Sequence, residues 1–177
     1  INVPDPVIVN MLSRDLVAAD LDKARQKDPD LIILVLHWGT EYDTIPSRAQ
    51  EEMAQFFFSR GADLIIGSHP HVLQKMIWTK KNQGNKDRVT VYSLGNFVSN
   101  QRRPKTDGGA MVRIGLEKNN DSLIVTGAGY YLTWVYTPFE NSRKRFFILP
   151  CSKFENNPDF FASPADYRKM MTFITGS

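Results

Sequence analysis

The sequence predicts a mixed α/β fold, and two observations lead to that prediction. An apolar run at residues 31–36, a helix-like segment and a second apolar run at 63–67 follow one another directly. Further along the chain, several segments rich in Val, Thr, Tyr and Trp are typical of β-strands. With 177 residues, 42% hydrophobic and 23% charged, the chain has the composition of one ordinary globular domain covering residues 1–177.

The first expected element is an amphipathic helix at residues 11–27. Its apolar side chains recur at helical spacing: Leu16, Val17, Leu21 and Ala24. Charged residues occupy the opposite face, and Pro29 prevents the helix from continuing. This segment is therefore expected to cover one side of the first strand.

A strand, a helix and a second strand are expected next. Six consecutive apolar residues at 31–36 are typical of a strand buried on both faces, as in a parallel sheet. Pro46 suits the first turn of a helix, and Gly61 stands where a C-terminal cap belongs. Because a second buried strand follows at 63–67, we expect the two strands to be parallel and joined by a right-handed crossover.

The rest of the chain is expected to be mostly antiparallel. Strands are predicted at 72–79, 88–94, 109–116, 122–136 and 146–149. A polar loop containing Gly84 and Asn85 separates the first two of these strands, and Ser163 and Pro164 open a last short helix.

Composition excludes several classes of protein. No apolar run reaches the roughly 20 residues of a membrane span. The single cysteine, Cys151, excludes an internal disulfide and a thiolate zinc cluster, and a packed, inert thiol is expected. The net charge of +3 is spread without the aromatic interleaving of a nucleic-acid module. Basic residues flank the predicted strand at 88–94, and they lie either in solvated loops or in a patch that binds an acidic ligand. They are Lys80, Lys81, Lys86, Arg88, Arg102, Arg103 and Lys105.

All three histidines follow predicted parallel strands. His37 follows the run at 31–36, and His69 and His71 follow the strand at 63–67. Ligands bind at this edge of open α/β sheets, so the topology predicts that the imidazoles meet there. Three imidazoles would suit zinc, manganese or iron, while the alternative is that each is a hydrogen-bonded structural residue.

Polar residues near these histidines are candidates for supporting roles. Glu41 and Asp43 follow His37 closely and could serve as second-layer ligands or in proton transfer. Asn96 follows Gly95 at the end of the predicted strand at 88–94, and it has either a functional role or only a place in a turn.

Three motifs carry a resemblance to a known family. They are His37-Trp-Gly-Thr-Glu-Tyr42, the segment from Gly61 to Val72, and Tyr92-Ser-Leu-Gly-Asn-Phe97. In order and spacing they resemble the CapA family of poly-gamma-glutamate capsule biosynthesis proteins. That family resembles the calcineurin-like metallophosphoesterases, and Gly67-Ser-His-Pro-His71 is similar to their Gly-His-x-His signature with serine in the first histidine position. The resemblance implies a four-layer α/β/β/α sandwich.

The resemblance also implies that part of the domain lies elsewhere. Nothing in residues 1–30 is similar to the Asp-x-His, Gly-Asp and Gly-Asn-His blocks that supply the bridging aspartate and the asparagine. The chain, which starts at Ile1 without a leader, is interpreted as an excised C-terminal half. The missing N-terminal half is then its partner, and catalysis is expected of the full-length protein rather than of this fragment.

By resemblance, the function expected is metal-dependent hydrolysis of a phosphoester or a related acyl or amide bond. His37, His69 and His71 would hold one or two manganese, zinc or iron ions. His37 and Glu41 would be catalytic, with Glu41 shuttling protons, and substrate would contact Asn96, Arg102 and Arg103. The expected location is the bacterial cell envelope, periplasmic or extracytoplasmic, with an anchor outside this chain and contact with membrane-associated capsule machinery.

Two alternatives stay open. The first is a non-catalytic envelope protein that binds or routes an anionic polymer such as poly-gamma-glutamate through its basic residues: Lys80, Lys81, Arg102, Arg103 and Lys105. The second is a vestigial site, in which the histidines are structural and the protein is a scaffold.

Overall fold

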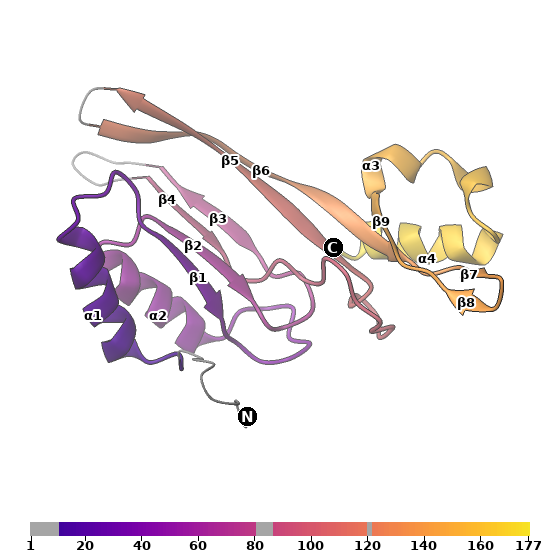
Figure 1. Cartoon of the computed structure of the whole chain (residues 1–177), viewed down its shortest axis with the longest axis horizontal. Coiled ribbons are helices and arrows are strands. Elements are labelled where there is room, and N and C mark those ends of the chain that lie inside the picture. Colours follow the sequence, from indigo (N-terminus) through magenta and orange to yellow (C-terminus); the bar gives the residue numbers. More distant parts are fainter. Residues whose placement is uncertain (1–10, 81–86, 120–121) are drawn as a thin grey trace.

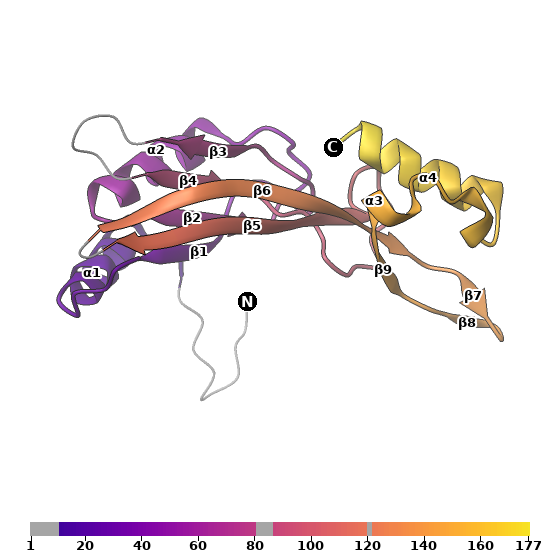
Figure 2. The same cartoon turned by 90° about the horizontal axis from the view of Figure 1, so that it is seen from above.

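The computed structural model describes residues 11–80, 87–119 and 122–177 and shows an elongated α/β molecule (Figure 1). A four-stranded sheet with two helices on one face forms one end. A long two-stranded ribbon crosses the other face of this sheet and continues into a C-terminal lobe at the far end (Figure 2). The mixed α/β class predicted from the sequence is confirmed.

Two helices cover one face of the sheet. Helix α1 (Arg14–Arg25) begins after Ser13, whose hydroxyl accepts a hydrogen bond from the backbone of Leu16. Helix α2 (Arg48–Ser59) begins after Ser47, which forms a reciprocal capping box with Gln50, so Pro46 precedes the cap instead of lying in the first turn. The helices and the sheet share one apolar core: Leu21, Leu36, Trp38, Ala54, Phe57, Phe58, Ala62, Ile65 and Tyr92.

The sheet has the strand order β1-β2-β4-β3. Strand β1 (Ile33–His37) pairs with β2 (Leu64–Ser68) in parallel, as predicted. Strand β4 (Arg88–Val91) also pairs in parallel with β2, so the expectation that this part is antiparallel was wrong for β4. Within this four-stranded sheet, β3 (Met76–Thr79) pairs with β4 and is the antiparallel member. The predicted loop with Gly84 and Asn85 lies outside the described residues.

The ribbon forms the second layer over the sheet. Strands β5 (Gly108–Asn119) and β6 (Ser122–Tyr136) are antiparallel, and β9 (Phe147–Pro150) pairs with the end of β6. Apolar side chains of the ribbon and of the sheet pack together in one cluster: Leu64, Val89, Val91 and Val125, with Val112, Ile114 and Ala128 partly buried against them. The four-layer sandwich implied by the resemblance stays a prediction.

The C-terminal lobe contains elements that the sequence only partly indicated. Helix α4 (Pro164–Thr175) was predicted, and Ser163 caps it. The short strands β7 (Phe139–Glu140) and β8 (Arg143–Lys144), helix α3 (Cys151–Phe154) and a 3-10 turn (Pro158–Phe160) were not predicted. The thiol of Cys151 is buried, and burial raises its pKa to about 11, so it stays protonated at neutral pH.

Within residues 11–80, 87–119 and 122–177, no helix has both the length and the apolar composition of a membrane span.

Gly67 allows the indole of Trp38 and the backbone of Tyr92 to pass close to β2, just before the histidines. Trp38 crosses β2 here, and its indole N–H donates to the carbonyl oxygen of Tyr92 at 3.0 Å. A Cβ at Gly67 would lie 2.1 Å from that oxygen and 2.3 Å from the indole nitrogen. A side chain therefore cannot be accommodated at this position unless Tyr92 or Trp38 moves.

Gly67→Ala is expected to lower the free energy of unfolding by about 2 to 3 kcal/mol, because backbone and a buried indole must both shift. Urea denaturation measures the change. Gly127→Ala is the matched control, since a Cβ there would meet no atom within 4 Å. Equal stability of the two variants would contradict the steric account.

Candidate functional site

The three histidines lie together at the C-terminal edge of the parallel strands. His37 ends β1 at the level of Ser68, so that it stands beside the residue that precedes His69. The ring centroids of His37 and His69 are 4.5 Å apart, and those of His69 and His71 are 6.2 Å apart. Strand topology therefore brings together side chains that are more than 30 residues apart in the chain.

The backbone that presents two of these imidazoles is strained. His69 has a φ of 107° and His71 a φ of 61°, on either side of the buried Pro70. Tyr42, whose amide donates to the carbonyl oxygen of Pro70 at 2.8 Å, has a φ of 70°. Non-glycine residues in this region cost about 1 to 3 kcal/mol each and cluster at functional sites. No pattern in the sequence indicated this strain.

The environment of His37 favours its neutral form. His37 is exposed at the end of β1, but desolvation of its ring, followed by the nearby imidazoles of His69 and His71, lowers its pKa below the ordinary value. A neutral imidazole has a nitrogen lone pair available, which is the form that binds metal ions.

Asn96 fixes the orientation of His71. The amide nitrogen of Asn96 donates to the carbonyl oxygen of Thr106 at 2.8 Å and to Oε1 of Gln101 at 3.2 Å. The amide oxygen therefore faces Nδ1 of His71, at 3.0 Å. Because this oxygen can only accept, Nδ1 carries the proton, and in the neutral ring the lone pair lies on Nε2. The side chain of Asn96 is 9% exposed and acts on His71 from inside the protein; a contact with substrate stays a prediction.

The two acidic candidates occupy different positions. Oε1 of Glu41 lies 3.8 Å from Nε2 of His71, and its side chain is 50% exposed. Glu41 is thus close to the free nitrogen and open to solvent. Asp43 contributes its backbone carbonyl, which accepts from the side chain of Gln74 at 2.8 Å. Among the described residues, its carboxylate makes no hydrogen bond or ion pair with a histidine.

Of the two arginine candidates, Arg103 lies at the histidine cluster. Its guanidinium stands 4.5 Å above the ring of Tyr42, and that ring is 6.1 Å from the ring of His71. Arg102 instead donates to the backbone carbonyls of Gln101 and Ser99, at 2.8 and 3.2 Å. Partial burial lowers the pKa of Arg102, opposed by Asp107. Arg102 therefore supports the loop that holds Gln101.

The bases around β4 do not form one patch. Lys80 follows β3 and Arg88 begins β4, where Thr79 pairs with Arg88. The histidines and Arg103 lie beyond the opposite ends of the parallel strands. The structure therefore separates the basic residues that the sequence groups together. Lys81 and Lys86 lie outside the described residues.

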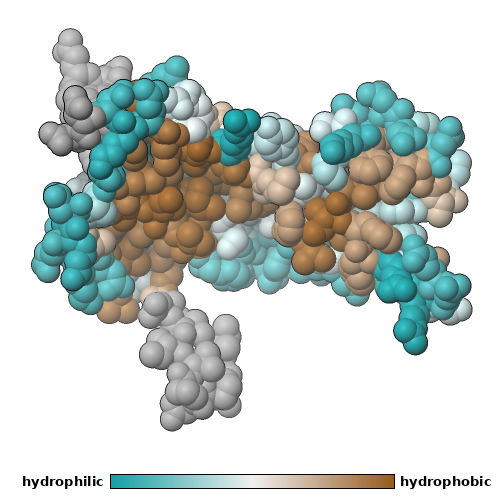
Figure 3. All heavy atoms as spheres, turned by 45° about the horizontal axis from the view of Figure 1, so that its top comes forward, coloured by the Kyte–Doolittle hydropathy of each residue, from teal (hydrophilic) through white to brown (hydrophobic). Residues whose placement is uncertain are grey.

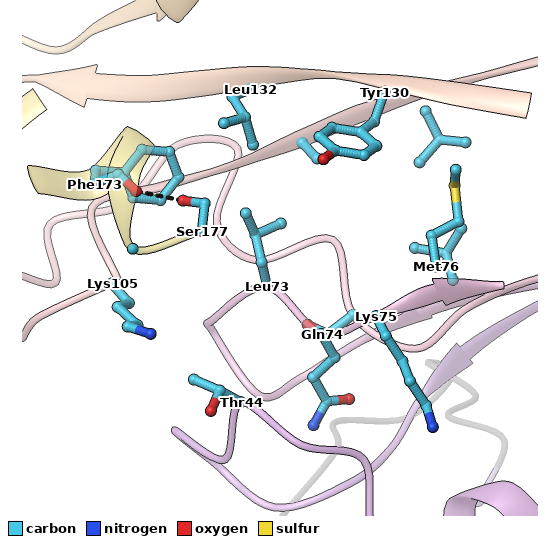
Figure 4. A pocket seen from close by; sticks show the side chains of 15 residues that line it. Thr44, Leu73, Gln74, Lys75, Met76, Lys105, Tyr130, Leu132, Phe173 and Ser177 are labelled. Atoms are coloured by element: carbon cyan, nitrogen blue, oxygen red, sulfur yellow. Dashed lines mark hydrogen bonds between the residues drawn. The ribbon is translucent and has the colours of Figure 1, made fainter. Parts of the chain in front are cut away.

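A separate cavity opens between the ribbon, β3 and the end of α4 (Figure 4). It measures about 470 Å³, and its apolar walls include Leu132 and Phe173. Lys75 lines one side, where it is paired with Glu51 at 2.5 Å. None of the three histidines lines this cavity, so it is distinct from the candidate site.

The donor types at the sheet edge suit a divalent metal, although the set is incomplete. The pKa of His37 is lowered, which favours its neutral form, and the contact with Asn96 directs Nε2 of His71 away from that amide. Within the described part of the chain, however, no three histidine, cysteine, aspartate or glutamate side chains are arranged to hold a metal ion. Further donors, or a rotation of the imidazoles, are needed to complete a coordination shell.

Comparison with known proteins places the chain in a family. Residues 3–101 match the family described as Bacterial capsule synthesis protein PGA_cap, which is more than half of the 177 residues and includes the three histidines and Asn96. The chain belongs to this family. It is similar to the Capsule biosynthesis protein CapA of Bacillus anthracis, with 37% identity over 118 residues, which are 64% of this chain and 27% of that protein.

A second PGA_cap relative shows the same pattern of partial coverage. The PGA biosynthesis protein CapA of Bacillus subtilis (strain 168) is 38% identical over 94 residues, which are 53% of this chain and 23% of that protein. The PGA_cap chain therefore spans about a quarter of the length of the curated relatives that it matches.

Sequence reasoning overlooked two residues that the structure places at the site. Tyr42, the last residue of the first motif, connects Arg103 to His71 through its ring. Gln101 orients the amide of Asn96. Tyr42 could have been considered from its place in the motif, whereas nothing in the local sequence distinguishes Gln101.

Proposed function

We propose that this PGA_cap chain supplies the histidine-bearing part of a divalent-metal-dependent hydrolase that acts in bacterial capsule biosynthesis. The observation that supports it is the gathering of His37, His69 and His71 on a strained sheet edge, with one tautomer fixed by Asn96. The proposed bond is a phosphoester or a related acyl or amide bond. One or two manganese, zinc or iron ions would bind in the full-length protein.

Each residue has a distinct part in this proposal. His37 and His69 would bind the metal as neutral imidazoles, and His71 would bind it through Nε2. A bound ion supplies an activated water and polarises the bond to be cleaved. Glu41, half-exposed and 3.8 Å from Nε2 of His71, would exchange protons with solvent. Arg103, held over Tyr42, would attract an anionic group of the substrate.

The biological setting comes from the names of the relatives. One is named a capsule biosynthesis protein and the other a PGA biosynthesis protein. We therefore place the proposed hydrolase in the cell envelope, at the surface where a capsule is assembled. Its substrate would be an anionic envelope polymer or a phosphoester.

Hydrolysis by the full-length protein tests the proposal. Bis(p-nitrophenyl) phosphate, p-nitrophenyl phosphate and γ-glutamyl-p-nitroanilide serve as probes, with added Mn²⁺ or with EDTA. Turnover is expected with Mn²⁺, with loss of about a hundredfold or more in His37→Ala. Turnover of no probe under any metal condition, or turnover unchanged by EDTA and by His37→Ala, would contradict the hydrolase proposal.

A second candidate function is non-catalytic binding of an anionic polymer. The position of Arg103 favours it, because the guanidinium stands exposed over Tyr42 beside the histidines. Because Lys80 lies at the opposite end of the sheet, we expect the polymer to be held at the histidine end alone.

Arg103→Ala is expected to weaken binding of labelled poly-gamma-glutamate about two- to fivefold at low salt, with a smaller change at high salt. Fluorescence anisotropy measures the affinity. Lys80→Ala is the matched control, since it removes a base at the opposite end of the sheet. Equal weakening by both variants would show that binding depends on total charge and not on the histidine end.

A further inference from the structure

The cavity between the ribbon and β3 has apolar walls and one polar side. Leu132, Met76 and Phe173 are among its apolar lining residues. Figure 4 shows polar side chains along the side away from the ribbon, here called the polar side: Thr44, Gln74, Lys75 and Lys105. Figure 3 shows that apolar side chains gather over the half of the molecule that contains the sheet and the ribbon. The volume of about 470 Å³ lies within the range of about 300 to 1,000 Å³ that is usual for small-molecule sites.

The buried polar groups that line the cavity already have partners within the protein. The side-chain amide of Gln74 donates to the carbonyl oxygen of Asp43 at 2.8 Å, and its Oε1 accepts from Gln50 at 3.3 Å. The hydroxyl oxygen of Ser93 accepts from the backbone of Gly95 at 3.3 Å. A sugar or a peptide would lose its water here without gaining new partners, which is costly. The interior therefore favours an apolar ligand.

Charge on the polar side favours an anion. Among the described residues that line the cavity, the charged side chains are Lys75 and Lys105, and none is acidic. Lys75 is paired with Glu51 at 2.5 Å. Lys105 is exposed and makes no ion pair in the part of the chain that the structure describes. Its ammonium group thus remains available to a negatively charged ligand.

We propose that this cavity binds one amphiphile with an apolar chain and a single anionic group, a carboxylate or a phosphate. The chain would lie against Leu132, Met76 and Phe173, and the anionic group would meet Lys105 on the polar side. A polyanion does not fit, because its repeated charges would have to enter apolar space. The site needs neither a metal nor the histidines, so the inference goes beyond the proposed hydrolase.

The polar side borders the loops that hold the candidate site. Thr44 lies two residues after Tyr42, and Lys105 lies two residues after Arg103. None of the three histidines lines the cavity. A bound amphiphile would therefore contact these loops and leave the histidines free.

Calorimetric titration of the full-length protein tests the proposal. Decanoate and decyl phosphate are the probes, below the concentrations at which they form micelles, and decanol is the uncharged control. One anion per chain is expected to bind. Its affinity should fall about two- to fivefold in Lys105→Gln and stay unchanged in Lys80→Gln, because Lys80 does not line the cavity. Absence of saturable binding by either anion would overturn the proposal. So would equal binding of decanol together with an unaltered affinity in Lys105→Gln.

Methionine methyl signals locate the bound chain in the unsubstituted protein. Met76 lines the cavity, whereas Met53 packs against the core between the helices and the sheet. Saturating decanoate or decyl phosphate is expected to shift the methyl resonance of Met76 and to leave that of Met53 in place. Saturable binding with no shift at Met76 would place the ligand elsewhere and overturn the proposal. Neither measurement involves turnover or metal, so this inference and the proposed hydrolase can fail separately.

Discussion

Replacing His69 and His71 together with alanine is expected to remove nearly all bound divalent metal from the full-length protein. Wild-type protein purified without chelators should contain manganese, zinc or iron near one equivalent or above, and the double variant less than about a tenth of that. The reason is that imidazole nitrogens bind these ions. The rings of His69 and His71 are both placed at this edge by a strained segment around Pro70. Elemental analysis measures the content.

Two features make this metal measurement decisive. Alanine carries a Cβ, as histidine does, so the strain at the positive φ angles of positions 69 and 71 is similar in the variant. The fold should therefore change little. Arg103→Ala is the matched control, because it alters the same site and guanidinium does not act as a metal ligand. Negligible metal in wild type and variant alike would remove the basis of the hydrolase proposal. Loss of metal in Arg103→Ala as well would show that the site had collapsed.

Asn96→Ala is expected to weaken metal binding about 10- to 100-fold without removing any ligand. Without the amide oxygen, nothing holds the proton on Nδ1 of His71, and the two tautomers should mix. The free energy of unfolding should also fall by about 1 to 3 kcal/mol, because the buried carbonyl of Thr106 loses its donor. Asn96 would therefore be a positioning residue for His71.

Nitrogen chemical shifts of the His71 ring in metal-free protein separate positioning from stability. Asn96→Asp keeps an acceptor facing Nδ1, so the tautomer should be retained although the interaction with Thr106 is lost. Gln101→Ala is the milder control, because the amide of Asn96 still donates to Thr106. If Asn96→Ala leaves both the ring shifts and the metal affinity unchanged, then Asn96 only stabilises the loop.

Local signals in the sequence predicted most of the elements. Each of four local features indicated an element that the structure contains. They are the apolar helical stripe that ends near Pro29, the apolar runs at 31–36 and 63–67, and the helix start at Ser163 and Pro164. These succeeded because helical periodicity, unbroken apolar runs and caps act within a few residues. The prediction that β4 is antiparallel was wrong, because the order of strands along the chain does not determine that β4 lies between β2 and β3.

The sequence by itself determined that the three histidines gather at one edge of the sheet. Because His37, His69 and His71 each follow a parallel strand, the pairing of β1 with β2 was enough to bring them to one edge. Only the tertiary structure decided how these residues are held. The positive φ angles around Pro70, the contact of Asn96 with His71 and the stacking of Arg103 on Tyr42 all depend on loops from distant strands. Such contacts arise from packing in three dimensions, for which local sequence patterns contain no signal.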